Sequence, residues 1–305
     1  MGRNPPVGMA FLSRTRNFAY GCIRSSSWRV AVARPMGPAR VLTAMMKPIS
    51  LAAMMFGITA LTATAQAQTV VALVGDDTIA MVDVAAKKVT GSTKVSGASG
   101  KLLGIDVRPA DGMLYGLMSD GTVVTIDPAS GKATMKSKLD TMLPAGAMAT
   151  VDFNPAADRL RVIGSDGTNL RANVDDGKVT KDGQLKFAEG DTLKGQTPKI
   201  VAGAYTNSMK GAKETALFDL DATGAVLKQA PPNDGVLNSV GMLGMRAETA
   251  AFDIVADGNG GNDGWLMAGE TLYKVDLATG KGTEYGKIAG VSGLVVRDIA
   301  ALPKM

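Results

Sequence analysis

The stretch Thr122-Val-Val-Thr-Ile-Asp127 decides the fold, because related copies of it recur along the chain. The copies are rich in β-branched and apolar residues, and they run into turns such as Pro128-Ala-Ser-Gly131 before another strand begins. This pattern predicts strand–turn–strand hairpins. The further copies, of which the last has one inserted residue, are Thr78–Asp83, Thr271–Asp276, Thr168–Asn173 and Thr215–Asp221.

Most of these hairpins follow another strand-like segment that carries one polar residue. Asp106 and Asp152 are 46 residues apart, and Asp253 and Asp298 are 45 residues apart. A repeat of about 40–50 residues is typical of a four-stranded propeller blade. Five blades are therefore expected, with a ring of polar residues around a central channel at Asp106, Asp152, Tyr205, Asp253 and Asp298.

The two ends of the repeat region are complementary. The first unit, from Val70 to Val95, has a hairpin but no preceding polar strand, and the last unit, from Gly293 to Leu302, has only that strand. Together they make one blade, and their pairing removes exposed sheet edges. The sequence predicts an all-β protein, a single five-bladed β-propeller over residues 68–305. The half-units disfavour the alternatives, a β-helix or a tandem sandwich.

The segment before the propeller has the features of an export signal. Up to Ala67 the chain has eight basic residues and no acidic ones, which leaves 25 basic and 28 acidic residues in the remainder. Lys47, an apolar run and Ala65-Gln66-Ala67 predict a signal peptide over 45–67, cleaved after Ala67. Residues 1–44 are interpreted as a mis-called start or a disordered extension. The mature chain is expected in the periplasm or outside the cell, without an integral membrane segment, and the basic leader is no reason to expect nucleic-acid binding.

The residue types restrict the chemistry. The chain has no His, and its one cysteine, Cys22, lies in the leader. This excludes a Cys/His zinc site, a Ser-His-Asp relay and a cysteine nucleophile from the mature domain. Catalysis would have to use carboxylates, amines or hydroxyls, so we expect a binding protein rather than an enzyme.

Polar residues that turns do not require are concentrated in the middle repeats. They could line the channel and bind a ligand, with the arginines clamping an anion. The alternative is structural: the carboxylates would accept backbone N–H bonds from a neighbouring blade, and the arginines would pair with Asp158, Asp166 and Asp175. The candidate ligand-binding residues are Asn154, Arg159, Arg161, Arg171, Tyr205, Asn207, Asn233, Asp234 and Asn238.

Oxygen-bearing side chains also suggest a calcium site. The sequence implies no other cofactor. The loop from Asp257 to Gly264 is rich in such side chains and in glycine, but it lacks the closing Glu of an EF-hand. A flexible hairpin loop is the alternative for this segment. The candidate metal ligands are Asp152, Asp253, Asp257, Asn259 and Asp263.

Several unusual motifs resemble a known family. Asp152-Phe-Asn154-Pro155, Ala204-Tyr205-Thr-Asn207 and the octet Pro231-Pro-Asn-Asp-Gly-Val-Leu-Asn238 are similar to segments of the secreted bacterial domain-of-unknown-function family 4394. The similarity extends from about Leu102 to Pro303. It implies a β-propeller exported by bacteria, and it implies no catalytic residue.

The octet has two interpretations. Its prolines and Asn-Asp-Gly turn are strong signals for a loop between strands. Alternatively, Asn233 or Asp234 faces the channel and contacts a ligand. The sequence alone leaves both interpretations open.

These observations predict a monomeric ligand- or partner-binding module of the cell envelope. Its partner would be a small molecule, a glycan or an envelope protein. One alternative is a calcium-assisted hydrolase or lactonase-type propeller with an all-oxygen metal site. A second alternative is a purely structural envelope protein.

Overall fold

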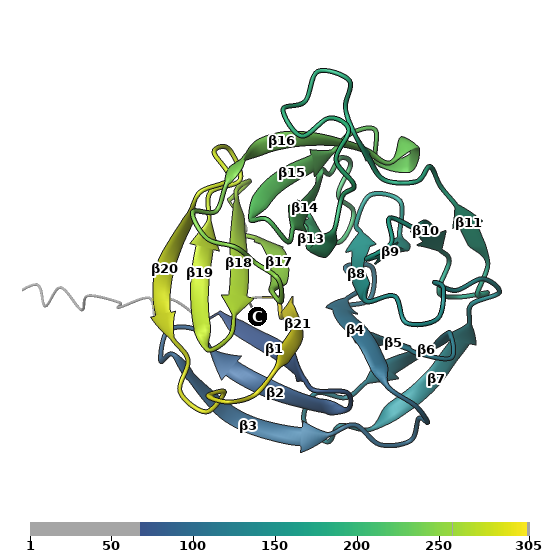
Figure 1. The fold of residues 1–305 in the computed structure, drawn as a ribbon. Helices are drawn as coiled ribbons and strands as arrows, with labels where there is room; N and C mark the ends of the chain where they lie inside the picture. The colour runs from purple at the N-terminus through teal and green to yellow at the C-terminus, as the bar shows by residue number, and fades with distance from the viewer. Residues whose placement is uncertain (1–67, 258, 304–305) are drawn as a thin grey trace, which may run out of the picture. The chain divides into compact units, whose positions relative to one another are not determined.

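The repeated hairpins build five sheets in the computed structural model, which describes residues 68–257 and 259–303. Each sheet is one blade of a β-propeller, and the blades surround a central opening (Figure 1). The predicted all-β, five-bladed propeller is therefore confirmed. The expected extension 1–44 and signal peptide 45–67 lie outside the described residues. Within those residues, no helix has the length and apolar character needed to cross a membrane.

The blades are numbered from the N-terminal strand, and each is given from the channel outward. Blade 1 consists of β21 (Val296–Ala301), β1 (Thr69–Val74), β2 (Thr78–Asp83) and β3 (Lys88–Lys94). Blade 2 consists of β4 (Leu102–Val107), β5 (Leu114–Met118), β6 (Thr122–Ile126) and β7 (Ala133–Lys138). Blade 3 consists of β8 (Ala149–Asn154), β9 (Arg159–Gly164), β10 (Asn169–Ala172) and β11 (Val179–Lys181).

Blade 4 consists of β13 (Ile200–Tyr205), β14 (Leu217–Asp221), β15 (Ala225–Gln229) and β16 (Val236–Met242). The short strand β12 (Lys186–Phe187) adds to its outer edge in parallel, and the 3₁₀ helix η1 (Pro232–Asp234) joins β15 to β16. Blade 5 consists of β17 (Ala251–Ala256), β18 (Asn262–Ala268), β19 (Thr271–Val275) and β20 (Gly282–Lys287).

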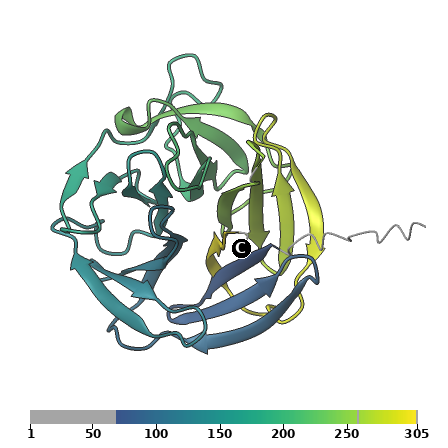
Figure 2. The same cartoon turned by 180° about the vertical axis from the view of Figure 1, so that it is seen from behind.

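The two ends of the propeller domain close the ring, as the half-units predicted. β1 pairs antiparallel with β21, with Val70 opposite Ala301, and the two strands lie side by side in both views (Figures 1 and 2). The Gln68 side chain adds a hydrogen bond from Nε2 to the Leu302 carbonyl (2.8 Å). Closure satisfies backbone groups that would otherwise form two exposed edges.

One of the five repeated segments forms a different strand of its blade from the other four. Thr78–Asp83, Thr122–Asp127, Thr168–Asn173 and Thr271–Asp276 contain the third strand of their blades, whereas Thr215–Asp221 contains β14, the second strand of blade 4. The cause is the turn that follows. Asp221 Oδ1 accepts the Thr223 N–H (2.9 Å) and Gly224 has φ of 92°, so this turn resembles those that follow the third strands elsewhere.

Apolar side chains fill the spaces between neighbouring blades. Val71 and Leu73 of β1, for example, pack with Ile105 and Leu114 of blade 2. Burying one such side chain contributes about 1.5–3 kcal/mol. This repeated burial stabilises a domain that contains no cysteine after residue 67.

Candidate functional site

The innermost strands β21, β4, β8, β13 and β17 each contact the next one around the channel. Four buried aspartates lie on these strands, at Asp106, Asp152, Asp253 and Asp298. Each accepts a backbone N–H from the innermost strand of the following blade, with acceptor–donor pairs Asp106–Phe153, Asp152–Tyr205, Asp253–Ala301 and Asp298–Ile105. The structural alternative for these carboxylates is thus observed directly.

The aspartates are not all at one level, which corrects the expected ring. Asp106 accepts the N–H of Phe153, the residue after Asp152, whereas Asp298 accepts the N–H of Ile105, the residue before Asp106. Asp298 is therefore displaced along the channel relative to the other three. A Cβ on Gly104 would lie 2.7 Å from Asp298 Oδ2, so glycine is required where this carboxylate crosses to blade 2.

The other three carboxylates converge. One oxygen from each of Asp106, Asp152 and Asp253 lies within 4.8 Å of those of the other two. Burial, followed by the charge of Asp253, raises the pKa of Asp106 well above its usual value. Burial and the charges of Asp106 and Asp253 have the same effect on the pKa of Asp152, and burial raises the pKa of Asp253 to about 6.

The hydrogen bonds of the three carboxylates differ. Asp106 and Asp253 use both oxygens, since each also accepts the N–H of the next residue in the chain. Asp152 is 6% exposed and bonds through Oδ1 to the Tyr205 N–H (2.9 Å). No donor among the described residues bonds to its Oδ2. This oxygen is available to a ligand.

A cavity of about 310 Å³ lies over the three carboxylates at one mouth of the channel. Its walls come from segments that follow the innermost strands, including Pro109, Ser208, Lys210, Asp257 and Pro303. The predicted metal ligands Asp152 and Asp253 thus line the cavity together with Asp257. Because this cavity lies over three converging carboxyl groups, it is the candidate functional site.

The remaining candidates in the loop 257–264 serve local contacts. Asp257 Oδ1 accepts the N–H groups of Asn259 (2.7 Å) and Gly261 (2.9 Å) and so shapes its own turn. Asp263 pairs with Lys274 Nζ (2.7 Å). Asp263 is therefore engaged outside the carboxylate cluster.

Arg161 is at the centre of a buried network between blades 3 and 4, away from the cavity. Its side chain is 2% exposed, and Nε donates to Tyr205 Oη (3.1 Å). Nη1 donates to Asn169 Oδ1 (2.8 Å) and to Asp182 Oδ2 (2.6 Å), and Nη2 donates to Asn233 Oδ1 (2.9 Å). This arrangement brings together the predicted residues Arg161, Tyr205 and Asn233; Arg161 and Tyr205 are buried between the blades, whereas Asn233 is exposed.

The carboxylate in this network is Asp182. Arg171 pairs with it through Nε (2.9 Å), in addition to Arg161. Burial tends to raise the pKa of Asp182, but hydrogen bonds from Arg171 and Arg161 hold it below the usual value. The expected partners of the arginines, Asp158, Asp166 and Asp175, were therefore wrong for Arg161 and Arg171.

The network also explains the octet Pro231–Asn238. The Asn233 carbonyl accepts the Gly183 N–H (2.8 Å), and the Pro232 carbonyl accepts a hydrogen bond from Asn169 Nδ2 (3.0 Å). The Asn238 side chain donates to the Ala230 carbonyl (3.1 Å), whereas the Asp234 side chain is exposed. The octet thus fastens the β15–β16 connection to blade 3, which favours the mechanical interpretation.

Three further candidates make local or inter-blade contacts. Asn154 Oδ1 accepts the N–H groups of Ala156 (3.0 Å) and Ala157 (2.8 Å), which caps the turn after β8. Arg159 donates to the Asp158 carbonyl (2.7 Å). Asn207 and Asn262 bond reciprocally (2.7 and 2.9 Å) and join blade 4 to blade 5.

Sequence reasoning missed Arg108, which joins blade 2 to blade 3. Its guanidinium binds Asp158 with two hydrogen bonds (2.8 and 2.6 Å) and also pairs with Asp175 (2.9 Å). Hydrogen bonds from Arg108 and Lys136 hold the pKa of Asp175 far below its usual value. The two partners of Arg108 lie 50 and 67 residues away from it in the sequence, so no local spacing could identify them.

Sequence reasoning also missed Asp219 on β14. Its side chain is fully buried, and neither carboxylate oxygen has a hydrogen-bond partner among the described residues. Burial raises the pKa of Asp219 to about 8, although the charge of Arg161 opposes the shift. A Cβ on Gly203, opposite it on β13, would lie 2.5 Å from Asp219 Oδ1. The one signal was an acidic residue within the apolar run Leu217–Leu220.

Fold and site together define a five-bladed β-propeller with a carboxylate-floored cavity at one channel mouth. Within this class, the chain belongs to the family described as "Domain of unknown function (DUF4394)", whose model matches residues 78–300. No curated protein matches the chain.

Solved structures of low identity were also found. A protein of unknown function from Bacteroides caccae is 13% identical with a TM-score of 0.42, covering 77% of this chain and 99% of its own. A structural genomics protein of unknown function from Bacteroides thetaiotaomicron is 17% identical with a TM-score of 0.48, covering 79% and 66%. The computationally designed Ika8 protein is 15% identical with a TM-score of 0.35, covering 72% and 59%.

Proposed function

We propose that this protein is an exported binding propeller whose ligand carries positive charge and occupies the cavity at the channel mouth. The observation that carries this proposal is the convergence of Asp106, Asp152 and Asp253 at the floor of that cavity. The family is a domain of unknown function, so the proposal rests on the site.

The electrostatics of the floor favour a cation. Three carboxylates buried this close cannot all ionise without strong mutual repulsion, and this repulsion contributes to the raised pKa values of Asp106 and Asp152. A positive charge among them would offset the repulsion and stabilise the ionised forms. Binding would therefore lower these pKa values and release protons from carboxylates that are still protonated.

The distances suit either a calcium ion or an organic ammonium group. Calcium holds oxygen ligands at about 2.3–2.6 Å, so two ligands on opposite sides of the ion are about 5 Å apart. The three floor oxygens lie within 4.8 Å of one another, Asp152 lines the cavity, and no donor among the described residues bonds to its Oδ2. The cavity volume of about 310 Å³ also has room for an organic ligand above the floor.

Binding is a better account than the two alternatives. A purely structural role explains the backbone N–H bonds to the carboxylates, but it gives no reason for the free oxygen of Asp152 or for the cavity above it. A calcium-assisted hydrolase or lactonase would use the same floor and would also need a group to activate water. The predicted signal peptide would bring the protein to its ligand in the cell envelope.

Thermal unfolding at about pH 8 tests the proposal, because a ligand that binds only the native state raises the melting temperature. We expect millimolar calcium or spermidine to raise it by about 5 °C or more relative to the protein in EDTA, equivalent to about 2–3 kcal/mol. Asp152→Asn should remove most of this shift. Its amide oxygen can still accept the Tyr205 N–H, so the variant should fold.

Asp263→Asn is the matched control, because Asp263 is a carboxylate that pairs with Lys274 and does not line the cavity. It should retain the full shift. If neither cation changes the melting temperature, or if Asp152→Asn responds as the wild type does, the binding proposal is wrong. A shift with calcium alone identifies a metal ion, and a shift with spermidine alone identifies an organic cation.

A further inference from the structure

A second cavity lies at the opposite mouth of the channel, where the innermost strands begin. Its volume is about 120 Å³, and all five blades contribute to its lining. The walls are mostly apolar and include Leu103, Met148, Val201, Ala250, Val295 and Val296. This mouth therefore differs in chemistry from the carboxylate-floored mouth.

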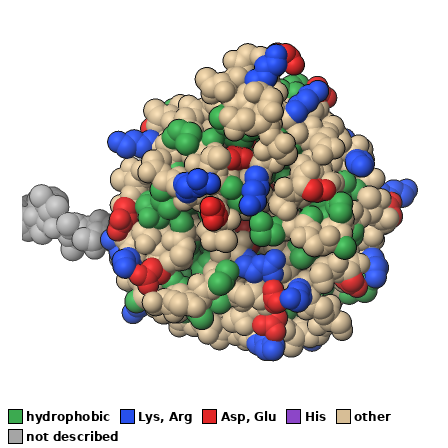
Figure 3. All heavy atoms as spheres, in the orientation of Figure 1, with side chains coloured by type: hydrophobic (Ala, Val, Ile, Leu, Met, Phe, Trp, Pro, Cys, Tyr) green, Lys and Arg blue, Asp and Glu red, His purple; other side chains and the backbone are tan. Residues whose placement is uncertain are grey.

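The apolar walls continue into exposed side chains at the rim. Val295 is 60% exposed, and Leu294 and Met148 are also exposed. Exposed apolar side chains gathered around a cavity are typical of a ligand-binding surface. Figure 3 shows hydrophobic side chains next to Lys or Arg and Asp or Glu side chains around the centre of the face in view.

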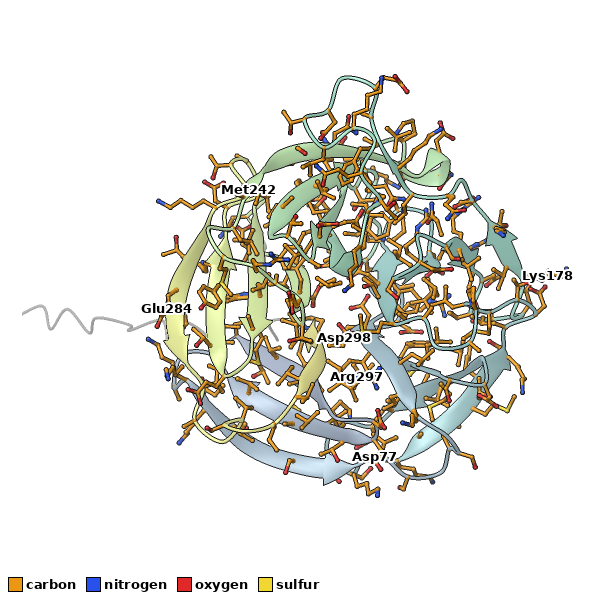
Figure 4. All side chains as sticks on the ribbon, viewed as in Figure 1. Asp77, Lys178, Met242, Glu284, Arg297 and Asp298 are labelled. Atoms are coloured by element: carbon orange, nitrogen blue, oxygen red, sulfur yellow. The ribbon has the colours of Figure 1, made fainter. Side chains whose placement is uncertain are left out.

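Arg297 is the cationic residue of this cavity. It lies on β21 beside the central opening (Figure 4), and its side chain is 25% exposed. Nη1 is held by Asp76 Oδ1 (2.6 Å) and by the Leu102 carbonyl (3.3 Å). No acceptor among the described residues bonds to Nε or Nη2.

The unused edge has the geometry for a carboxylate. Nε–H and Nη2–H of a guanidinium point in the same direction and bind the two oxygens of a carboxylate side by side. Asp76 also pairs with Lys101 (2.8 Å), so it neutralises Arg297 only in part. Glu248 lines the cavity as well, but its side chain is 71% exposed and lies 3.7 Å from Arg246.

We propose that this second cavity binds a small amphipathic carboxylate, with the anionic head on the Nε and Nη2 edge of Arg297 and the apolar tail against Met148, Val201 and Val295. The site is independent of the carboxylate-floored cavity and takes a ligand of opposite charge. Affinity should increase with the length of the tail until the apolar walls are covered, since each buried CH₂ contributes about 0.8 kcal/mol.

Titration calorimetry with a series of straight-chain carboxylates from acetate to octanoate tests the proposal. We expect one site per chain for the carboxylates, with affinity that rises along the series, and we expect the corresponding alkylamines not to displace octanoate. Arg297→Lys should weaken octanoate binding by at least about tenfold, because an ammonium group cannot bind a carboxylate side by side. Arg159→Lys, on β9 and outside this cavity, should bind octanoate as the wild type does.

Two further variants keep the test decisive if Arg297→Lys is unstable. Val295→Asp changes an exposed position and should abolish octanoate binding by placing a negative charge at the rim. Asp263→Asn, whose side chain lies outside this cavity, should leave it unchanged. The proposal is overturned if octanoate does not bind at millimolar concentration, or if it binds equally well to the wild type, Arg297→Lys and Val295→Asp.

Discussion

Replacement of Arg161 by methionine is expected to lower the free energy of unfolding by about 3–5 kcal/mol, which corresponds to a melting temperature about 10 °C lower. The substitution removes hydrogen bonds to Tyr205, Asn169, Asp182 and Asn233. It leaves the buried carboxylate of Asp182 with Arg171 as its remaining ion-pair partner. Most of the cost comes from this buried, poorly compensated charge.

Urea unfolding followed by circular dichroism measures this loss. Arg159→Met is the matched control, because Arg159 is on the same strand and is only partly buried. It should cost less than about 1 kcal/mol. Combining Arg161→Met with Asp182→Asn should recover part of the loss by removing the buried charge that Arg171 alone compensates poorly. A loss for Arg161→Met no larger than that for Arg159→Met would show that the network does not hold blades 3 and 4 together.

The stability of the ligand-free protein should fall as the pH rises from about 4 to about 8. Asp253 and Asp219 have pKa values of about 6 and about 8 in the folded protein, both above the value of 3.8 taken for an unperturbed aspartate. Between those values the folded state binds more protons than the unfolded state, so each rise in pH favours unfolding. Asp175 and Asp182 have lowered pKa values, so their ionised forms stabilise the fold above pH 4. This stabilisation is lost only in stronger acid, where the two carboxylates are protonated.

Asp219→Asn isolates the larger contribution, because an amide does not ionise. The difference in free energy of unfolding between the variant and the wild type should shift in favour of the variant as the pH rises. Between pH 4 and about pH 9 this shift should reach up to about 5 kcal/mol. Urea unfolding at a series of pH values measures this shift. Asp234→Asn, at an exposed position, should keep the pH profile of the wild type. Parallel profiles for Asp219→Asn and the wild type would show that Asp219 is ionised in the folded protein.

The fold could be predicted because its information is local and repeated. The hairpin Thr122–Asp127 and its copies fix the strand type, and the half-units at the ends fix the closure of the ring. The displaced copy at Thr215–Asp221 marks the limit of this approach. The second and the third strand of a blade have similar composition and are followed by similar turns. Composition alone therefore does not tell which of the two strands a segment forms.

The candidate site could be predicted only in part. The repeat period identified Asp106, Asp152 and Asp253, but it placed Asp298 at their level because a period does not fix the register between innermost strands. The repeat also gives no information on contacts between blades. Arg161 and Asn233 are 72 residues apart, so their hydrogen bond follows from the packing of two blades.

Titration of the protein with calcium and with spermidine by calorimetry, near pH 6.5 and in two buffers of different ionisation enthalpy, tests the central claim most directly. At this pH Asp253, whose pKa is raised to about 6, is protonated in part of the molecules, and burial shifts the pKa values of Asp106 and Asp152 in the same direction. We therefore expect one cation to bind per chain with release of protons, and we expect Asp152→Asn to weaken binding by at least about tenfold. The absence of binding heat for both cations, or equal affinity in the wild type and Asp152→Asn, would contradict the assignment of the channel mouth as a cation-binding site.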